Sequence, residues 1–282
     1  MTTVINTNVN AMFSANALTI NSRVQSNVME QLSTGSRINS AADDAAGLAI
    51  SDKMTAQIRG LNMAVRNGND AVSLLQTAEG SMIQQTSMLQ RMRELAVQAS
   101  GDTTLLADKT YLNTEFTSLM GEIDRIGKNT QWNGANVLDA SGGAATNGTY
   151  NFQVGANASQ TISVAIKKMV AGDVSGSMVG ISVSSVTTSA SASAAVTAID
   201  AAIAVVDAQR ATLGAGVNQL TYAVDNLTNV AQNATASRSQ ILDTDYAAAT
   251  SKLAKSQIIA QAATAMLAQA NQQPQSVLAL LK

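Results

Sequence analysis

Few side chains in this chain of 282 residues could do chemistry. Histidine and cysteine are both absent, so a soft-metal site, a cysteine nucleophile or a Ser-His-Asp triad cannot be built. Asp43, Asp44 and Asp52 come nearest to a hard-metal cluster, but no glycine-bearing calcium loop surrounds them and helix capping explains them better. Because no acid, base and nucleophile converge, we expect neither enzyme activity nor a bound cofactor or metal.

The composition narrows the class of partner. A formal charge of −2 and the lack of a dense basic stripe argue against nucleic-acid binding. We expect no apolar run long enough to cross a bilayer. The terminal segments lack a cationic face opposite aromatic residues, so we also expect no membrane insertion. The start has no basic region of the Sec type, which predicts that any secretion uses another route. An aromatic content of 3% argues against a thick core of large residues.

Both ends of the chain combine helical periodicity with an unusual lack of charge. No charged side chain precedes Arg23, and no acidic one follows Asp245. A helix exposed to water normally carries charge on its outer face, so these segments favour the inside of an assembly. We predict a polymerisation interface formed by apolar residues of both segments: Val9, Phe13, Ile20, Val24, Val28, Leu253, Ile259 and Leu267.

Between these ends, the periodicity predicts a mirror-like order of elements. A first helix from about Asn8 should end at Gly35, and a second should start near Ser40, which can cap it, and run past Ala99. A shorter helix follows over residues 105–128, and Asn133-Gly134 marks a turn.

The middle of the chain changes period before the helices return. Tyr150, Phe152 and Val154 alternate with polar residues, as do the residues at 162–166, which predicts a β-hairpin. Residues 171–194 read as a loop or small β-rich tip. The following heptad seam runs from Val196 through Arg210 and Val217 to Ala231. The sequence therefore predicts a mainly α fold, a long antiparallel helical coiled-coil bundle with a small central β-hairpin region.

Energetics predict how the outermost helices behave. Their stripes hold modest apolar residues, and a thin pair of helices is marginally stable by itself. We therefore predict that the terminal arms are largely disordered in the free monomer and become helical when many copies pack together.

Two long motifs resemble those of bacterial flagellin. The run LSTGSRINSAADDAAGLAI from Leu32 to Ile50 resembles the amino-terminal signature, and LAQANQQPQSVL from Leu267 to Leu278 resembles the carboxy-terminal one. The chain departs from the usual pattern at Trp132, where phenylalanine is common, and at Ala249, where an acid is common. The resemblance covers about residues 1–170 and 195–282, and the segment between them is short.

The resemblance implies a structural subunit that leaves the cell unfolded through the flagellar type III apparatus and polymerises into the extracellular flagellar filament. Its implied partners are other copies of itself, an export chaperone, the filament cap and the hook-junction proteins. The resemblance also assigns the segments: 1–39 an inner-tube helix with its spoke linker, 40–170 the first part of the bundle domain with the hairpin, 171–194 a short variable outer loop, 195–237 the last helix of the bundle, and 238–282 the second inner-tube helix. A hook–filament junction protein, with similar terminal helices, is the alternative.

The family resemblance adds two further expectations. The segment Gln90–Val97 resembles the one that the animal Toll-like flagellin receptor recognises, which implies an epitope of Arg91, Glu94, Leu95 and Glu115, with Arg91 and Leu95 on the flanks of the apolar stripe. For the bacterium, subunit contacts explain the same residues better. Family habit also suggests O-linked sugars on hydroxyl groups of the central segment: Ser175, Ser177, Ser182, Ser184, Ser185, Thr187 and Thr188.

Overall fold

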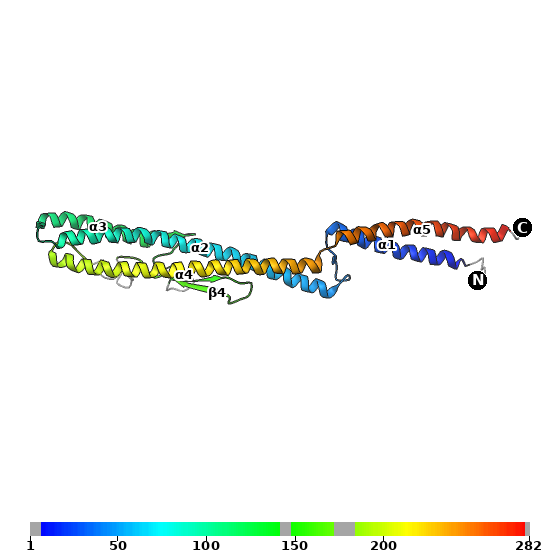
Figure 1. Ribbon diagram of the computed structural model, residues 1–282, viewed down its shortest axis with the longest axis horizontal. Coiled ribbons are helices and arrows are strands. Elements are labelled where there is room, and N and C mark those ends of the chain that lie inside the picture. The colour runs from blue at the N-terminus through cyan, green and yellow to red at the C-terminus, as the bar shows by residue number, and fades with distance from the viewer. Residues whose placement is uncertain (1–6, 142–147, 172–183, 280–282) are drawn as a thin grey trace. The chain divides into compact units, whose positions relative to one another are not determined.

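The computed structural model describes residues 7–141, 148–171 and 184–279, which are mainly helical. Figure 1 shows the order of the elements, which include two short antiparallel strand pairs. The helices are α1 (Val9–Thr34), α2 (Ala45–Ser100), α3 (Leu106–Asn129), α4 (Ser189–Leu242) and α5 (Tyr246–Ala279). The chain divides into unit 1, residues 1–56 with 233–282, and unit 2, residues 57–232, so each boundary falls inside α2 or α4. The predicted mainly α fold with a small hairpin region is confirmed.

Unit 2 is a helical bundle in which α2 lies against both α3 and α4 (Figure 1). Its core is contiguous and contains residues from all three helices, such as Leu75 and Leu89 of α2, Phe116 of α3 and Leu213 of α4. Alanine is frequent in this core beside leucine, methionine and isoleucine, so the helices pack mainly through aliphatic side chains of mixed size.

The buried stripe of α4 has the predicted heptad spacing and contains Ile199, Val206, Leu213, Leu220, Leu227 and Ala231 as predicted, but some of the alternate positions shift by one residue. The expected seam positions Arg210 and Val217 lie on its flank, and Gln209 and Gly216 take their place. Gln209 fits because its Nε2 donates to the carbonyl oxygen of Ala165 at 2.8 Å. Gly216 fits because a side chain there would press on Val164, 3.0 Å from the position of its Cβ. The buried residues are Ala192, Ala195, Ile199, Ala202, Val206, Gln209, Leu213, Gly216, Leu220, Leu227 and Ala231.

The predicted turn at Asn133-Gly134 forms between two short strands that the sequence did not predict. β1 (Gln131–Trp132) and β2 (Ala135–Asn136) flank Asn133 and Gly134, whose φ angles of 50° and 79° suit a tight hairpin turn. β3 (Thr149–Gln153) and β4 (Thr161–Ala165) pair antiparallel, with Tyr150 opposite Val164. The predicted β-hairpin is therefore confirmed, and Val164 joins the core of unit 2.

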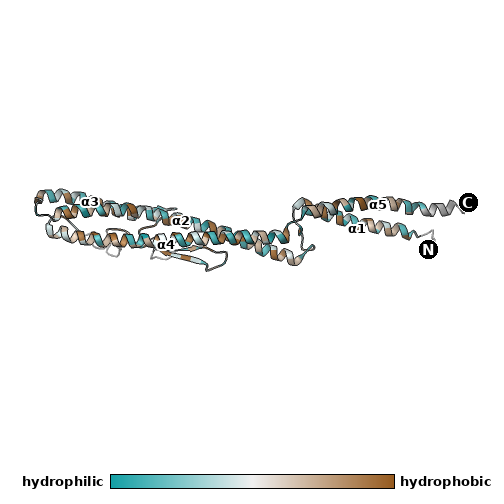
Figure 2. Ribbon diagram, viewed as in Figure 1, coloured by the Kyte–Doolittle hydropathy of each residue, from teal (hydrophilic) through white to brown (hydrophobic). Residues whose placement is uncertain are grey.

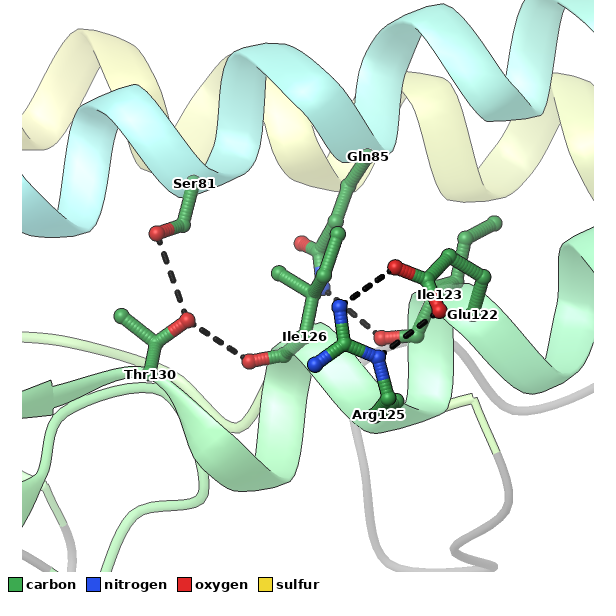
Figure 3. A network of polar contacts seen from close by, with 7 residues as sticks. All are labelled: Ser81, Gln85, Glu122, Ile123, Arg125, Ile126 and Thr130. Atoms are coloured by element: carbon green, nitrogen blue, oxygen red, sulfur yellow. Dashed lines mark hydrogen bonds and ion pairs between the residues drawn. The ribbon is translucent and has the colours of Figure 1, made fainter.

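A buried glutamine joins α2 to α3. Gln85 is fully buried, and its Nε2 donates to the carbonyl oxygens of Ile123 and Met169 at 3.3 and 3.0 Å. Figure 3 shows the first of these bonds beside that from the Thr130 hydroxyl to Ser81 Oγ at 3.2 Å. Since these bonds join α2 to the end of α3 and to the segment after β4, they fix how the three pack.

A glycine ends α1, and an aspartate caps the start of α2. Gly35 has a φ of 71° and ends α1 as predicted. Asp44, and not the expected Ser40, caps α2, since its Oδ1 accepts from the Gly47 N–H at 2.9 Å. Asp43 instead accepts the N–H groups of Ser40 and Asn39 in the preceding turn, and these bonds lower the pKa of Asp43.

The start of α4 corrects the predicted loop of residues 171–194. The hydroxyl of Thr188 accepts the N–H of Ser191 at 3.1 Å, so α4 begins at Ser189 and the last part of the expected loop is helical. The sequence did not reveal this cap, because the serine and alanine residues of the segment show no clear helical period.

The expectation that no apolar run is long enough to cross a bilayer is wrong for one described helix. Among the described residues, α4 is long and apolar enough to cross a membrane by length and composition alone. Core helices pass the same test, and α4 buries its heptad stripe within unit 2. The helix is therefore weak evidence for membrane insertion.

Candidate subunit interface on the terminal helices

Within unit 1, α1 and α5 form an antiparallel pair joined by amide side chains. Asn8 Nδ2 donates to the carbonyl oxygen of Ala270 at 2.8 Å, and Asn21 Nδ2 donates to that of Ser256 at 2.7 Å. Asn21 and Ser256 are both buried. A short amide can reach the backbone of the neighbouring helix only where the two helices approach closely.

Small residues permit this close approach. The stripe of α5 that contacts α1 repeats at alternating steps of three and four and consists mainly of alanine: Ala249, Leu253, Ser256, Ala260, Ala263, Leu267 and Ala270. The stripe of α1 that contacts α5 holds small and amide residues, with Asn21 and Val28 the most deeply buried. The pair therefore depends on close contact and amide bonds more than on large apolar side chains.

The predicted interface residues separate into two groups. Val9, Phe13, Ile20, Val24 and Ile259 face away from the partner helix and are 42–70% exposed.

The other three, Val28, Leu253 and Leu267, lie buried or half-buried between α1 and α5, so they join the two helices, and their contact with other subunits stays a prediction. Helical periodicity could not separate the two groups, because α1 carries two stripes at helical spacing. The less apolar of these stripes contacts α5.

The outward stripe is an uncovered apolar surface. Figure 2 shows hydrophobic residues along both helices. On α1, Phe13 is 70% exposed and its neighbour Met12 is 64% exposed. On α5, Ile258 and Met266 are 66% and 64% exposed. No charged side chain lies on α1 before Arg23, so the exposed part of this stripe is both apolar and uncharged.

Unit 1 has two short linkers, residues 35–44 between α1 and α2 and residues 243–245 between α4 and α5. Hydrogen bonds connect the first linker to the second and to the end of α4. The Arg37 guanidinium donates to the carbonyl oxygen of Ile241 at 2.7 Å, and its N–H donates to that of Leu242 at 2.6 Å. Thr244 N–H donates to Gly35 at 2.9 Å. Arg37 thus satisfies carbonyl groups at the end of α4. The sequence motif around Arg37 gave no sign of this pairing, because the partners are about two hundred positions away.

A second candidate surface lies on unit 2, where α2 meets α3. Arg91 forms ion pairs with Glu94 at 3.0 Å and with Glu115 at 2.9 Å, and all three side chains are about half exposed or more. Hydrogen bonds to Glu94 and Glu115 raise the pKa of Arg91.

Leu95, expected on the flank, is instead 1% exposed and part of the core. The stripe prediction failed there because α2 packs against two helices, so its buried face is wider than one stripe.

A neighbouring arginine joins α2 to α4 and was missed by the sequence reading. Arg93 bonds both carboxylate oxygens of Asp200, at 2.6 and 3.3 Å. This hydrogen bonding holds the pKa of Asp200 below its ordinary value. Arg91 and Arg93 therefore connect α2 to α3 and α4 at nearly the same level, and no spacing rule could have paired residues of separate helices.

The structure describes only part of the predicted glycosylation segment. Ser175, Ser177 and Ser182 lie outside the described residues. Ser184, Ser185 and Thr187 are half-buried. Thr188 is exposed, but its hydroxyl caps α4 and contacts Ser191. Sugars on these residues stay a prediction.

A pair of long helices with an uncovered apolar face, which carries no charge on α1 before Arg23, defines a self-associating helical protein. Residues 5–142 match the bacterial flagellin N-terminal helical region, and residues 196–281 match the bacterial flagellin C-terminal helical region. The chain therefore belongs to the bacterial flagellin family.

Curated relatives agree with this assignment over nearly their full length. The chain is 44% identical to a flagellin of Halalkalibacterium halodurans, over 99% of this chain and 100% of the relative. It is 43% identical to a flagellin of Bacillus subtilis, over 99% of both chains. It is also 40% identical to a flagellar filament 31.3 kDa core protein of Treponema maltophilum, over 99% and 100%.

Proposed function

We propose that this flagellin is the subunit of the extracellular flagellar filament and that the outward stripes of α1 and α5 bind neighbouring copies. Flagellins are structural filament proteins and not enzymes. The observation that carries the proposal is the uncovered apolar face of unit 1, on which Phe13 is 70% exposed. The full-length match to flagellins favours this function over that of a hook-junction protein.

Burial of this face supplies the energy of assembly. Full burial of a valine, isoleucine or phenylalanine side chain contributes about 1.5–3 kcal/mol. Each copy offers several such side chains on α1 and more on α5. A contact between different patches of successive copies repeats without closing and generates a filament. The helix pair alone is thin, so we infer that it gains lasting order only when other copies cover it.

Export and accessory partners complete the proposal. The chain passes unfolded through the flagellar type III apparatus, with an export chaperone, and assembles between the hook-junction proteins and the filament cap. The sequence supports an unfolded passage because it contains no cysteine and so no disulfide to break. The family resemblance of both terminal motifs supports these partners.

Substitution of the outward stripe tests the interface. A Phe13→Ser, Ile20→Ser double variant should fail to elongate sheared filament seeds, because the neighbouring copy loses two apolar contacts. Sedimentation and electron microscopy measure the growth. Asn10→Ser, an exposed polar change on the same helix, is the control and should grow like the parent. Normal filaments from the double variant would refute the proposed interface.

A second function concerns recognition by an animal host. We propose that the exposed Arg91, Glu94 and Glu115 form a surface for the Toll-like flagellin receptor, with Leu95 acting only through the core. Arg91→Ala should weaken receptor signalling by the monomer and leave its unfolding midpoint nearly unchanged, since exposed ion pairs add little stability. Arg125→Ala, which removes a similar exposed ion pair with Glu122, is the matched control. Unchanged signalling by Arg91→Ala would contradict the proposal.

A further inference from the structure

Two exposed methionines lie at the same level of the α1–α5 pair. Met12 of α1 and Met266 of α5 are each 64% exposed. Asn8 bonds Ala270, so Met12, one turn further along α1, is level with Met266, one turn back along the antiparallel α5. Met12 also lies one turn from Val9 on the outward stripe. One level of the pair therefore presents two thioethers to solvent.

The methionines of unit 2 provide an internal contrast. Met82, Met92 and Met169 are fully buried in its core. Met63 on α2 is 50% exposed but lies outside the terminal helix pair. An oxidant dissolved in water reaches exposed thioethers before buried ones. Among the described residues, Met12 and Met266 are therefore the most exposed methionines, and Met29 of α1 follows at 54%.

We propose that Met12 and Met266 are oxidation sites at which a hydroperoxide blocks self-association of the free subunit. The inference rests on the proposed function of the terminal helices. With hydrogen peroxide as the hydroperoxide, the thioether sulfur attacks one oxygen and the O–O bond breaks as the S–O bond forms. The attacked oxygen gives up its proton, and the departing hydroxide takes up a proton and leaves as water. The sulfur loses two electrons and the peroxide gains them. A dithiol-dependent methionine sulfoxide reductase reverses the change, releasing water as the dithiol becomes a disulfide.

The sulfoxide opposes assembly because it places a strong acceptor in an apolar contact. The exposed side chains next to Met12 include Val9 and Phe13, which offer no hydrogen-bond donor. Covering the sulfoxide oxygen with a neighbouring copy removes its water without replacing the bond, and this is unfavourable. Once a copy has joined the polymer, the same neighbour shields both sulfurs, so oxidation acts on free subunits and not on assembled ones.

Seeded growth after peroxide treatment tests the proposal. Full-length monomer is treated with hydrogen peroxide, the sulfoxides are located by peptide mass spectrometry, and elongation of sheared seeds is followed by sedimentation. Treated monomer should elongate roughly tenfold more slowly or worse, and reductase with dithiothreitol should restore the rate. Met12 and Met266 should resist oxidation in preformed filaments.

Variants separate these two sites from the other methionines. Met12→Leu, Met266→Leu keeps the volume and apolar character, and its growth rate after peroxide should equal its own rate without peroxide. Met63→Leu should stay as sensitive as the parent. Equal sensitivity of the double leucine variant, or normal growth of parent monomer carrying both sulfoxides, would overturn the inference. Failure of the untreated parent to grow on seeds would instead overturn the proposed function, and this inference with it.

Discussion

Amide side chains occupy places in the helix seams where apolar residues are the usual choice. Asn21 is 8% exposed and Gln209 is 3% exposed, and each donates to a backbone carbonyl of another element. A buried amide stabilises the register in which its partner is present and disfavours the others. Periodicity of apolar residues passes over both positions, so their role is visible only with the partner segments in place.

Glycines of α2 allow a test of helix approach at the residue scale. A Cβ at Gly68 would lie 2.5 Å from Cγ2 of Val224, whereas a Cβ at Gly80 would meet nothing within 4 Å. We expect Gly68→Ala to lower the free energy of unfolding by about 1–3 kcal/mol through overpacking. Gly80→Ala should raise it by about 1 kcal/mol through helix propensity. Urea unfolding measures both, and equal effects would contradict the close approach of α2 and α4.

At the element scale, α1 and α5 have two tasks that use different faces. The faces toward each other carry alanine and amide residues, and the faces away from each other carry Phe13, Ile20 and Ile258. Val28, Leu253 and Leu267 also lie between the helices, so larger apolar residues occupy both faces, and the outward ones have no cover within the pair. This arrangement is stable only where something covers the outer face.

Truncation tests the division of labour between elements. Deletion of residues 1–20 or 263–282 should abolish polymerisation, since each removes part of the helix pair and its outward face. The unfolding transition of unit 2 should persist, because its core lies within residues 57–232. Circular dichroism and electron microscopy measure the two outcomes. Filaments of normal appearance from either truncation would contradict this assignment.

Local signals predicted the elements well and their contacts less well. Gly35, the Asn133-Gly134 turn and the alternation around Tyr150 each act within a few residues, so the sequence places the end of α1, the turn and the pair of β3 with β4. The burial of Leu95 and the seam phase at Gly216 depend on helices far away in the chain. Helical spacing placed all eight predicted interface residues in one group, although Val28, Leu253 and Leu267 lie between α1 and α5 and the other five face outward.

At the scale of the whole molecule, stability is distributed unequally between the two units. Unit 2 has a continuous core of fully buried residues, whereas the contact of α1 with α5 has few large side chains. Local openings require little free energy where few apolar contacts are lost. We infer that the two units open independently and that unit 1 opens first.

Amide hydrogen exchange measures this difference directly. In the dilute monomer, residues 8–32 should exchange quickly, and the buried stretches of α2 and α4 in unit 2 should exchange slowly. In filaments, protection of residues 8–32 should rise toward that of unit 2, because neighbouring copies then cover the pair. Strong protection of residues 8–32 in the dilute monomer would contradict the predicted folding on assembly.

The helices α2 and α4 share a core but lie far apart along the sequence, and this affects how the chain folds during its synthesis. A growing chain completes α2 at Ser100, but α4, which covers residues such as Leu75, begins only at Ser189. During synthesis, the nascent polypeptide thus displays half of a core whose other half has not yet been made. Native closure waits until most of the message has been translated, and this delay gives cellular factors time to capture the chain in an extended form.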